Sequence, residues 1–254
     1  MHFPKSRVTT IFLAATFGAA LLASPAIAPA QAKPSGLPPA IREQMDAASA
    51  KFTSAQADLK QEIFTKVVHD TETQTGQIYF LRKAGSTQMG MKLLPPDAAP
   101  GAAPDKVIQF SGGKLSVFSP GTNQVDQFDE SRNKSLAESL MTLGFGGSGT
   151  DLAKSWSITD LGADAVTDGG KTVQTQKLDL VSNDQNIRNT YSHIIIWLDP
   201  ARDVSLKQVL FLASGGTPTG DTRTVYYSNI QLNQPVDPAP FTIKCKGKCT
   251  VVPH

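Results

Sequence analysis

Residue types that catalytic and metal sites usually require are scarce in this sequence. Among its 254 residues there are two cysteines and four histidines. His2 and His254 lie at the two ends, which leaves His69 in a polar turn and His193 in an apolar stretch. No Gly-x-Ser-x-Gly elbow, His-Glu-x-x-His helix, phosphate-cradling glycine loop or calcium-loop spacing occurs. We therefore expect a binding or scaffold protein that is not an enzyme and uses no metal or cofactor.

A long hydrophobic run occurs near the N-terminus. Lys5 and Arg7 precede an apolar stretch at 8–23, and small residues and prolines follow up to Ala32. This order is typical of a secretory signal peptide, here residues 1–32, with an uncleaved anchor as the alternative. We expect cleavage near Ala32 and a soluble exported protein.

Net charge is absent once the signal peptide is left out. The full chain has 24 basic and 22 acidic residues; residues 1–32 hold two basic and no acidic ones, and 24 − 2 leaves 22 of each. No basic cluster stands out, which argues against a nucleic-acid partner and gives no sign of electrostatic membrane binding. The remaining chain is expected to contain a linker at 33–40, one domain at 41–245 and a tail at 246–254.

Hydrophobic periodicity predicts two helices and many strands. Helices are expected over 40–52 and 135–143, with apolar stripes at Ile41, Met45, Ala48, Phe52, Leu136, Leu140 and Leu143. Strands are expected over 57–64, 76–82, 89–94, 106–110, 114–118, 124–128, 156–159, 171–180, 191–198, 206–212 and 222–230. So long a meander should coil. We therefore predict a mainly β fold, a curved antiparallel sheet that forms a half-open barrel with a helical lid over an apolar cavity. The glycine-rich run 144–149 should be a hinge or slack loop.

One apolar face of the sheet is expected to line the cavity. Ile78 and Phe80 share a face with Arg82, which ends its strand. The candidate lining residues are Ile78, Phe80, Met89, Met91, Ile108, Val117, Ile194, Ile196, Val209 and Phe211. Ordinary packing under a helix is the alternative for each, because alternation does not reveal which face is concave. Arg82 is either solvated or placed against a partner, since an unpaired buried guanidinium is too costly.

Cys245 and Cys249 lie near the C-terminus in the segment Cys-Lys-Gly-Lys-Cys. In an oxidising compartment a disulfide across the glycine turn is the simpler interpretation. A metal site is the alternative, but two thiols without a nearby pair of histidines make a weak ligand set. A disulfide here would fasten the tail rather than the core.

Three short segments, in this order, resemble motifs of one known family. Residues 57–61, Ala-Asp-Leu-Lys-Gln, are similar to Ala-Asp-Phe-x-Gln, and residues 76–82, Gly-Gln-Ile-Tyr-Phe-Leu-Arg, to Gly-x-Leu-x-x-Lys-Arg-Pro. Residues 110–118, Phe-Ser-Gly-Gly-Lys-Leu-Ser-Val-Phe, with Pro120, Gln124 and Val125, are similar to Ser-Asp-Gly-x-x-Leu-Trp-x-Tyr-x-Pro-x-x-x-Gln-Val. These motifs belong to the outer-membrane lipoprotein carrier family, LolA. The segment 88–92 lacks that family's aromatic run, and 95–104 resembles an insertion.

The resemblance implies a periplasmic carrier that shields the acyl chains of lipoproteins and moves them from the inner to the outer membrane. Its partners would be acylated lipoproteins, an inner-membrane lipoprotein-releasing ABC transporter and an outer-membrane receptor. It also implies that Arg82 holds the lid through backbone carbonyls and that the lid contacts the sheet through Met45, Phe52, Leu136, Leu140 and Leu143. We expect a monomer.

Other functions remain open from the sequence. An envelope carrier or sensor of the same fold could bind free lipids. A structural or interaction domain could fill the cavity with its own side chains. A hydrolase has the least support, since no catalytic constellation is present.

Overall fold

The computed structural model describes residues 36–83, 85–99, 101–129, 131, 138, 140 and 143–254. These residues belong to one unit, which spans Lys33–His254. The predicted signal peptide, its cleavage near Ala32, Leu136 and most of the predicted helix over 135–143 lie outside the described residues.

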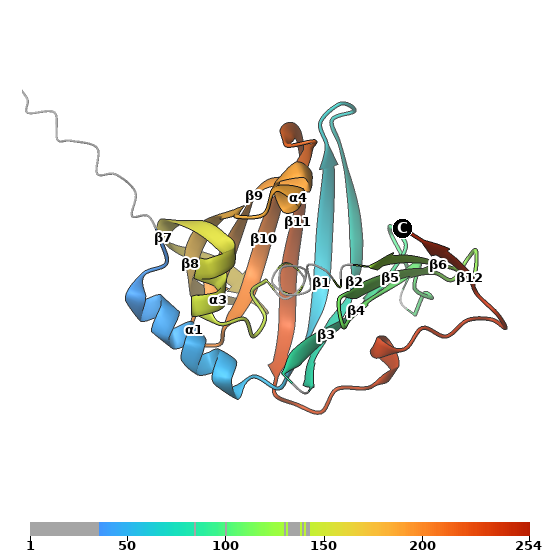
Figure 1. Ribbon diagram of the computed structural model, residues 1–254, viewed down its shortest axis with the longest axis horizontal. Helices are drawn as coiled ribbons and strands as arrows, with labels where there is room; N and C mark the ends of the chain where they lie inside the picture. The colour runs from blue at the N-terminus through green and yellow to red at the C-terminus, as the bar shows by residue number, and fades with distance from the viewer. Residues whose placement is uncertain are drawn as a thin grey trace, which may run out of the picture. The chain divides into compact units, whose positions relative to one another are not determined.

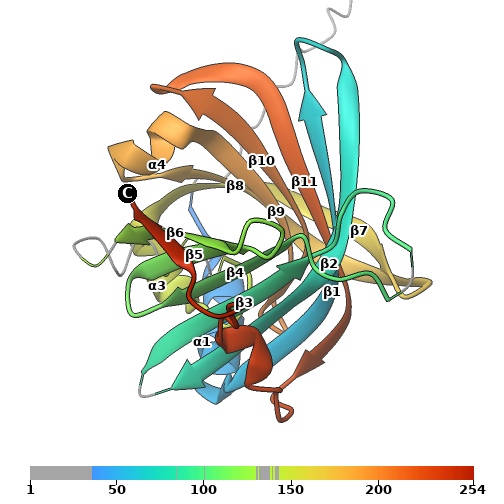
Figure 2. The ribbon, with the colours of Figure 1, turned by 90° about the vertical axis from the view of Figure 1, so that its right-hand side faces the viewer.

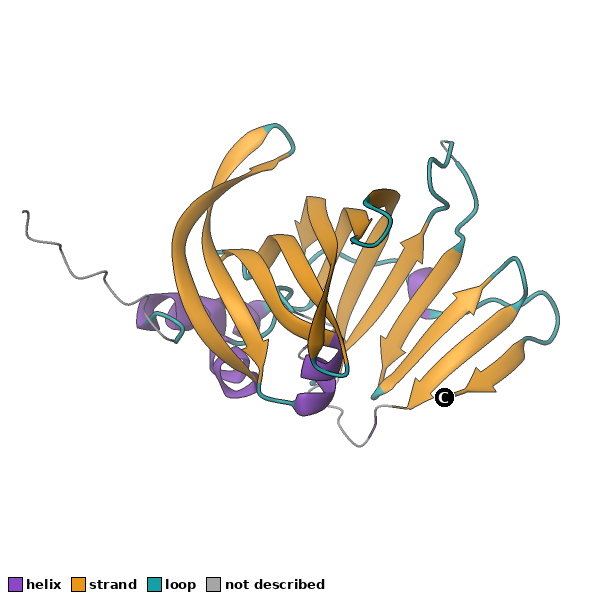
Figure 3. Ribbon diagram, turned by 90° about the horizontal axis from the view of Figure 1, so that it is seen from above, coloured by secondary structure: helices purple, strands orange, loops and turns teal. Residues whose placement is uncertain are grey.

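One large, curved and open sheet contains the twelve strands of the described chain (Figures 1 and 3). In the order of the sheet these are β12 (Thr250–Pro253), β6 (Gln124–Asp129), β5 (Lys114–Ser119), β4 (Lys106–Ser111), β3 (Ser86–Leu93), β2 (Asp70–Lys83), β1 (Ser54–Thr65), β11 (Thr217–Leu232), β10 (Val204–Ser214), β9 (Tyr191–Asp199), β8 (Lys171–Ser182) and β7 (Trp156–Asp168). Neighbouring strands are antiparallel except β12 and β6, which are parallel. The predicted mainly β, half-open architecture is confirmed, with this parallel pair as a correction.

Short helices join and cover the strands. The described residues include α1 (Pro39–Lys51), α3 (Gly149–Ser155), α4 (Gln185–Thr190) and the 3-10 turn η2 (Ala239–Phe241). α1 starts with a proline, whose missing N–H costs nothing at that position, and matches the helix expected over 40–52. α3 and α4 are too short for an apolar stripe and were not predicted. Both begin at side-chain caps, Ser148 and Asp184.

The two faces of the sheet carry different coverings. Directly paired residues of neighbouring strands point to the same face. One face is therefore marked across β1 to β5 by the row Ala57, Ile78, Met91, Ile108 and Val117. We call it the lid face, because α1 and residues 143–148, which we call the lid loop, pack their apolar side chains on it. The opposite side is the outer face.

Two apolar clusters lie between the sheet and its lid. The first combines Phe52 and Phe145 with side chains of β1–β4, β10 and β11. The second combines Met45, Leu143 and Leu152 with side chains of β7–β9. A fully buried large apolar side chain contributes about 1.5–3 kcal/mol. The covered lid face is therefore the main source of the fold's stability.

The C-terminal segment, residues 233–254, is a strap across the outer face (Figure 2). It leaves β11 at Asn233, whose N–H donates to the Ser54 carbonyl over 2.8 Å. At η2 the Pro240 carbonyl accepts a hydrogen bond from Gln109 Nε2 over 3.2 Å. That carbonyl lies so close to Gly90 that a Cβ there would be 2.5 Å from it. The strap ends as β12, so residues 250–253 of the expected tail at 246–254 are part of the sheet.

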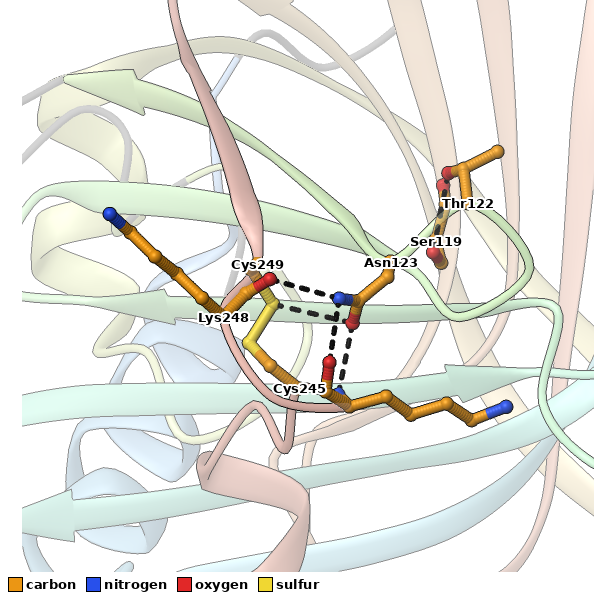
Figure 4. Close-up of a disulfide and its surroundings, with 7 residues drawn as sticks. Ser119, Thr122, Asn123, Cys245, Lys248 and Cys249 are labelled. Carbon is orange, nitrogen blue, oxygen red and sulfur yellow. Dashed lines mark hydrogen bonds between the residues drawn. A yellow bond between two sulfur atoms is a disulfide. The ribbon is translucent and has the colours of Figure 1, made fainter.

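A disulfide joins Cys245 and Cys249 in the strap, with 5.4 Å between their Cα atoms (Figure 4). Both thiols are consumed by this bond, so they are not metal ligands here. The loop lies beside the turn between β5 and β6, where Asn123 holds its backbone. The disulfide thus fastens the strap just before β12.

Candidate functional site

The lid face brings together most of the predicted lining residues. Ile78, Phe80, Met89, Ile194 and Ile196 are buried in the two clusters. Met91 and Ile108 are partly buried against the first cluster, and Val117 continues their cross-strand row. They therefore share one continuous apolar surface beneath the lid.

Two of the predicted lining residues face the other way. Val209 pairs with Ile195 and Phe211 pairs with His193, whereas Gln208 pairs with Ile196 and Leu210 with Ile194. Because paired residues share a face, Val209 and Phe211 lie on the outer face, and Phe211 stacks on the His193 ring there at 4.0 Å. The prediction for them was wrong because β10 is apolar on both faces, so alternation alone could not choose between them.

The predicted lid residues contact both clusters. Met45 and Leu143 are buried in the second cluster, and the partly buried Leu140 packs against it. Phe52 follows the last residue of α1 and belongs to the first cluster. The stripe of α1 therefore spans two clusters rather than one.

Arg82 lies at the end of β2, between α1 and the lid loop. Its Nη1 donates to the Ser49 carbonyl over 2.6 Å, and its Nη2 donates to the Gly146 carbonyl. Its guanidinium carbon is 5.1 Å from the centre of the Phe52 ring. Ser49 Oγ also donates to the Gly146 carbonyl, over 2.8 Å.

Phe145 fills the space under the lid loop and is only 1% exposed. Its ring stacks on Phe80 with 4.7 Å between centroids and meets Tyr227 edge-on at 4.9 Å. The loop is held on β10, since Ser205 N–H donates to the Gly144 carbonyl over 2.7 Å. The run 144–149 is therefore not a slack loop. Phe145, which we call the plug, packs under the loop at its start, and Ser148 caps α3 at its end. In the sequence, the one sign of this packing was Phe145, a single aromatic residue among glycines.

A buried polar network supports the lid loop from the sheet. Gln208 Nε2 donates to the Leu143 carbonyl over 2.6 Å, and Tyr227 Oη donates to Gln208 Oε1 over 3.4 Å. Burial raises the pKa of Tyr227, which keeps its hydroxyl protonated. These contacts satisfy polar groups that would otherwise be costly under the lid.

Asp203, just before β10, is an unusual buried carboxylate. It is 1% exposed, and neither carboxylate oxygen has a hydrogen-bond partner among the described residues. Burial raises its pKa to about 8, against the opposing effect of the Arg82 charge. Its backbone carbonyl accepts a hydrogen bond from Gly146 N–H over 3.3 Å. A neutral carboxyl group therefore lies directly beneath the lid loop at acidic and neutral pH.

A cleft of about 600 Å³ lies beside these contacts. Its lining combines the apolar side chains of Met45 and Leu143 and the glycines of the lid loop with polar and charged groups that include Arg82, Asp151 and Lys154. Ligand sites commonly have this size, but most of the side chains that line this cleft are polar or charged. In the described part of the chain, no three histidine, cysteine, aspartate or glutamate side chains gather as a metal-binding group. Nor does any described helix have the length and apolar character needed to cross a membrane.

Gly146→Ala is expected to destabilise the closed lid by about 2 kcal/mol or more. Gly146 has a φ of +71°, and a Cβ there would lie 2.4 Å from the Phe52 ring. Left-handed strain and overpacking each cost about 1–3 kcal/mol. Gly147→Ala is the matched control, because a Cβ there has nothing within 4 Å. Urea unfolding of both variants measures the difference, and equal midpoints would show that the loop is not tightly packed.

Comparisons with known proteins find distant structural likenesses. No protein-family model and no curated protein matches the sequence. Among solved structures, an uncharacterised conserved protein from Thermus thermophilus matches 85% of this chain and 98% of its own at 12% identity, with a TM-score of 0.49. A LolA superfamily protein from Nitrosomonas europaea matches 80% of this chain and 96% of its own at 16% identity, with a TM-score of 0.37. Lipoprotein LppX from Mycobacterium tuberculosis matches 79% of this chain and 99% of its own at 11% identity, with a TM-score of 0.41.

These likenesses concern the fold alone. The structural neighbours also include a putative outer membrane lipoprotein-sorting protein domain from Vibrio parahaemolyticus, at 13% identity with a TM-score of 0.41. The fold itself is a curved open sheet with a small helical cover.

Proposed function

We propose that the protein is a periplasmic carrier that shields the acyl chains of lipoproteins beneath its lid and transfers them from the inner to the outer membrane. One observation carries the proposal. A single charged side chain, Arg82, fastens both α1 and the lid loop through backbone carbonyls above an apolar sheet face. A cover held in this way can give way to cargo without any change in the sheet. The sequence motifs support an acylated lipoprotein as that cargo.

Acyl chains fit the lid face on energetic grounds. Each buried methylene contributes about 0.8 kcal/mol, so ten of them contribute roughly 8 kcal/mol. The empty protein covers the same surface with Phe52 and Phe145, at about 1.5–3 kcal/mol each. Cargo can therefore displace these rings. Their return to the sheet lowers the free energy needed to release the cargo.

The proposal extends to the partners that such transfer requires. A lipoprotein-releasing ABC transporter of the inner membrane would load the carrier, and an outer-membrane receptor would unload it. The carrier acts as a monomer and performs no chemical reaction on its cargo. It needs no cofactor, because loading and release exchange one set of apolar contacts for another.

Mass spectrometry of material bound to the protein purified from an envelope extract tests the proposal. Co-purified lipoprotein is the expected result. Free phospholipid alone would instead support a lipid carrier or sensor of the same fold. The complete burial of Phe145 favours a third possibility, a domain plugged by its own side chains. No bound lipid and no uptake of an apolar dye would support that plugged domain.

Arg82→Leu is expected to leave the fold intact and to slow transfer of cargo to an acceptor by at least about tenfold. Hydrogen bonds from a charged group contribute about 1.5–3 kcal/mol each. Losing two of them weakens the closed empty state, so cargo is retained. Arg188→Leu is the control, since Arg188 also donates to a backbone carbonyl, that of Ser182, away from the lid loop. Unchanged transfer rates in Arg82→Leu would remove Arg82 from the mechanism.

A further inference from the structure

The disulfide loop of the strap concentrates positive charge. Lys244, Lys246 and Lys248 alternate with the two cysteines, and residues 238–254 contain no acidic residue. All three lysines are exposed. Within the described residues, none of them takes part in a salt bridge. The balanced total charge of residues 33–254 conceals this local excess.

The backbone of this loop is fixed on the sheet (Figure 4). Asn123 Nδ2 donates to the carbonyls of Lys246 and Lys248 over 3.0 and 3.1 Å, and Asn123 Oδ1 accepts from Lys246 N–H over 3.0 Å. The disulfide closes the turn, in which Gly247 adopts a φ of +69°. Figure 4 shows the side chain of Lys248 extending away from the strap. The three charges are therefore held close together without being neutralised.

We propose that this loop, residues 244–249, docks the protein on an anionic phospholipid surface. A lysine ammonium is a hydrated point charge, which suits a fluid array of head groups better than a shaped protein pocket. A stable protein interface buries about 800 Å² on each partner, far more than a loop of six residues offers. A lipid surface needs no such complementarity. Val251, 55% exposed beside the loop, adds an apolar contact at the same place.

The expected binding is weak, reversible and sensitive to salt. Each lysine near an anionic membrane strengthens binding by about fivefold, so three lysines give roughly 100-fold. The attraction falls within a Debye length, about 10 Å at 0.1 M salt. Weak attachment suits a protein that must leave the surface again.

Sedimentation with vesicles tests the proposal. The disulfide-bonded chain of residues 33–254, which includes every described helix and strand, is mixed with phosphatidylglycerol–phosphatidylcholine vesicles and with pure phosphatidylcholine vesicles at low salt. We expect binding to the anionic vesicles alone. The variant with Lys244, Lys246 and Lys248 changed to Gln should lose roughly 100-fold in partition coefficient. The control variant changes Lys51, Lys83 and Lys114, three other exposed lysines, to Gln and should lose much less.

Several results would overturn the proposal. These are equal losses in the two triple variants, equal binding to both kinds of vesicle, and selective capture of an acidic protein without vesicle binding. Thermal unfolding of both variants checks that each is folded. The experiment contains no lipoprotein and measures attachment to the vesicle surface, so a negative result leaves the proposed carrier function untouched.

Discussion

Phe145→Ala is expected to lower the free energy of unfolding by about 3–5 kcal/mol. The ring is almost completely buried, stacks on Phe80 and meets Tyr227 edge-on. Its removal leaves an apolar cavity between the lid loop and β2. The same variant should bind more of an apolar dye, because the plug that competes with the dye has gone. Urea unfolding and dye titration measure the two effects.

Phe145→Leu is the matched control for this prediction. Leucine refills most of the volume, and a hydrophobic replacement of similar size usually costs less than about 1.5 kcal/mol. Dye binding should remain close to that of the parent protein. If Phe145→Ala lost less than about 1 kcal/mol, well under the usual cost of removing a buried ring, the lid loop would be shown to rest on the sheet without a tightly filled contact.

Asp203→Asn is expected to make the protein more stable at pH 8 and to have little effect near pH 4. The folded-state pKa of Asp203 is raised to about 8 from an ordinary value of 3.8. Between these values the folded chain holds one more proton than the unfolded chain, so the free energy of unfolding falls as pH rises, by up to about 1.4 kcal/mol per pH unit. Asparagine does not titrate and accepts the left-handed φ of +54° at this position.

Urea unfolding at pH 4, 6 and 8 measures the effect of Asp203→Asn. The stability difference between the variant and its parent should grow with pH. Asp97→Asn is the control, because Asp97 has a similar φ of +52° but is exposed. A difference that stays constant with pH would show that Asp203 gains no proton on folding.

The strands of the sheet could be predicted from the sequence because their signal is local. Alternation and turn residues placed eleven strands close to their observed positions. The two-residue alternation cannot assign side chains to a face of the sheet where a strand is apolar on both faces. β10 is such a strand, and Val209 and Phe211 were assigned to the wrong face for this reason.

The plug and the strap could not be predicted because they depend on contacts between distant segments. Phe145 is buried through residues of β2 and β11, far away in the sequence. β12 forms only where β6 is already present as a partner. Ser148, with Asp151 three residues later, was a local capping signal for the start of α3. It was missed because Ser148 lies within the glycine-rich run 144–149.

The ends of the sheet decide whether one copy of this protein can add strands to another. A free edge exposes unpaired N–H and C=O groups, which invites aggregation. One end is closed by β12, a strand of four residues that terminates in Pro253, and proline has no N–H to offer. The other end, β7, is interrupted by a bulge between Asp160 and Gly162. An open sheet of this size can therefore resist the edge-to-edge addition of a second copy at high protein concentration.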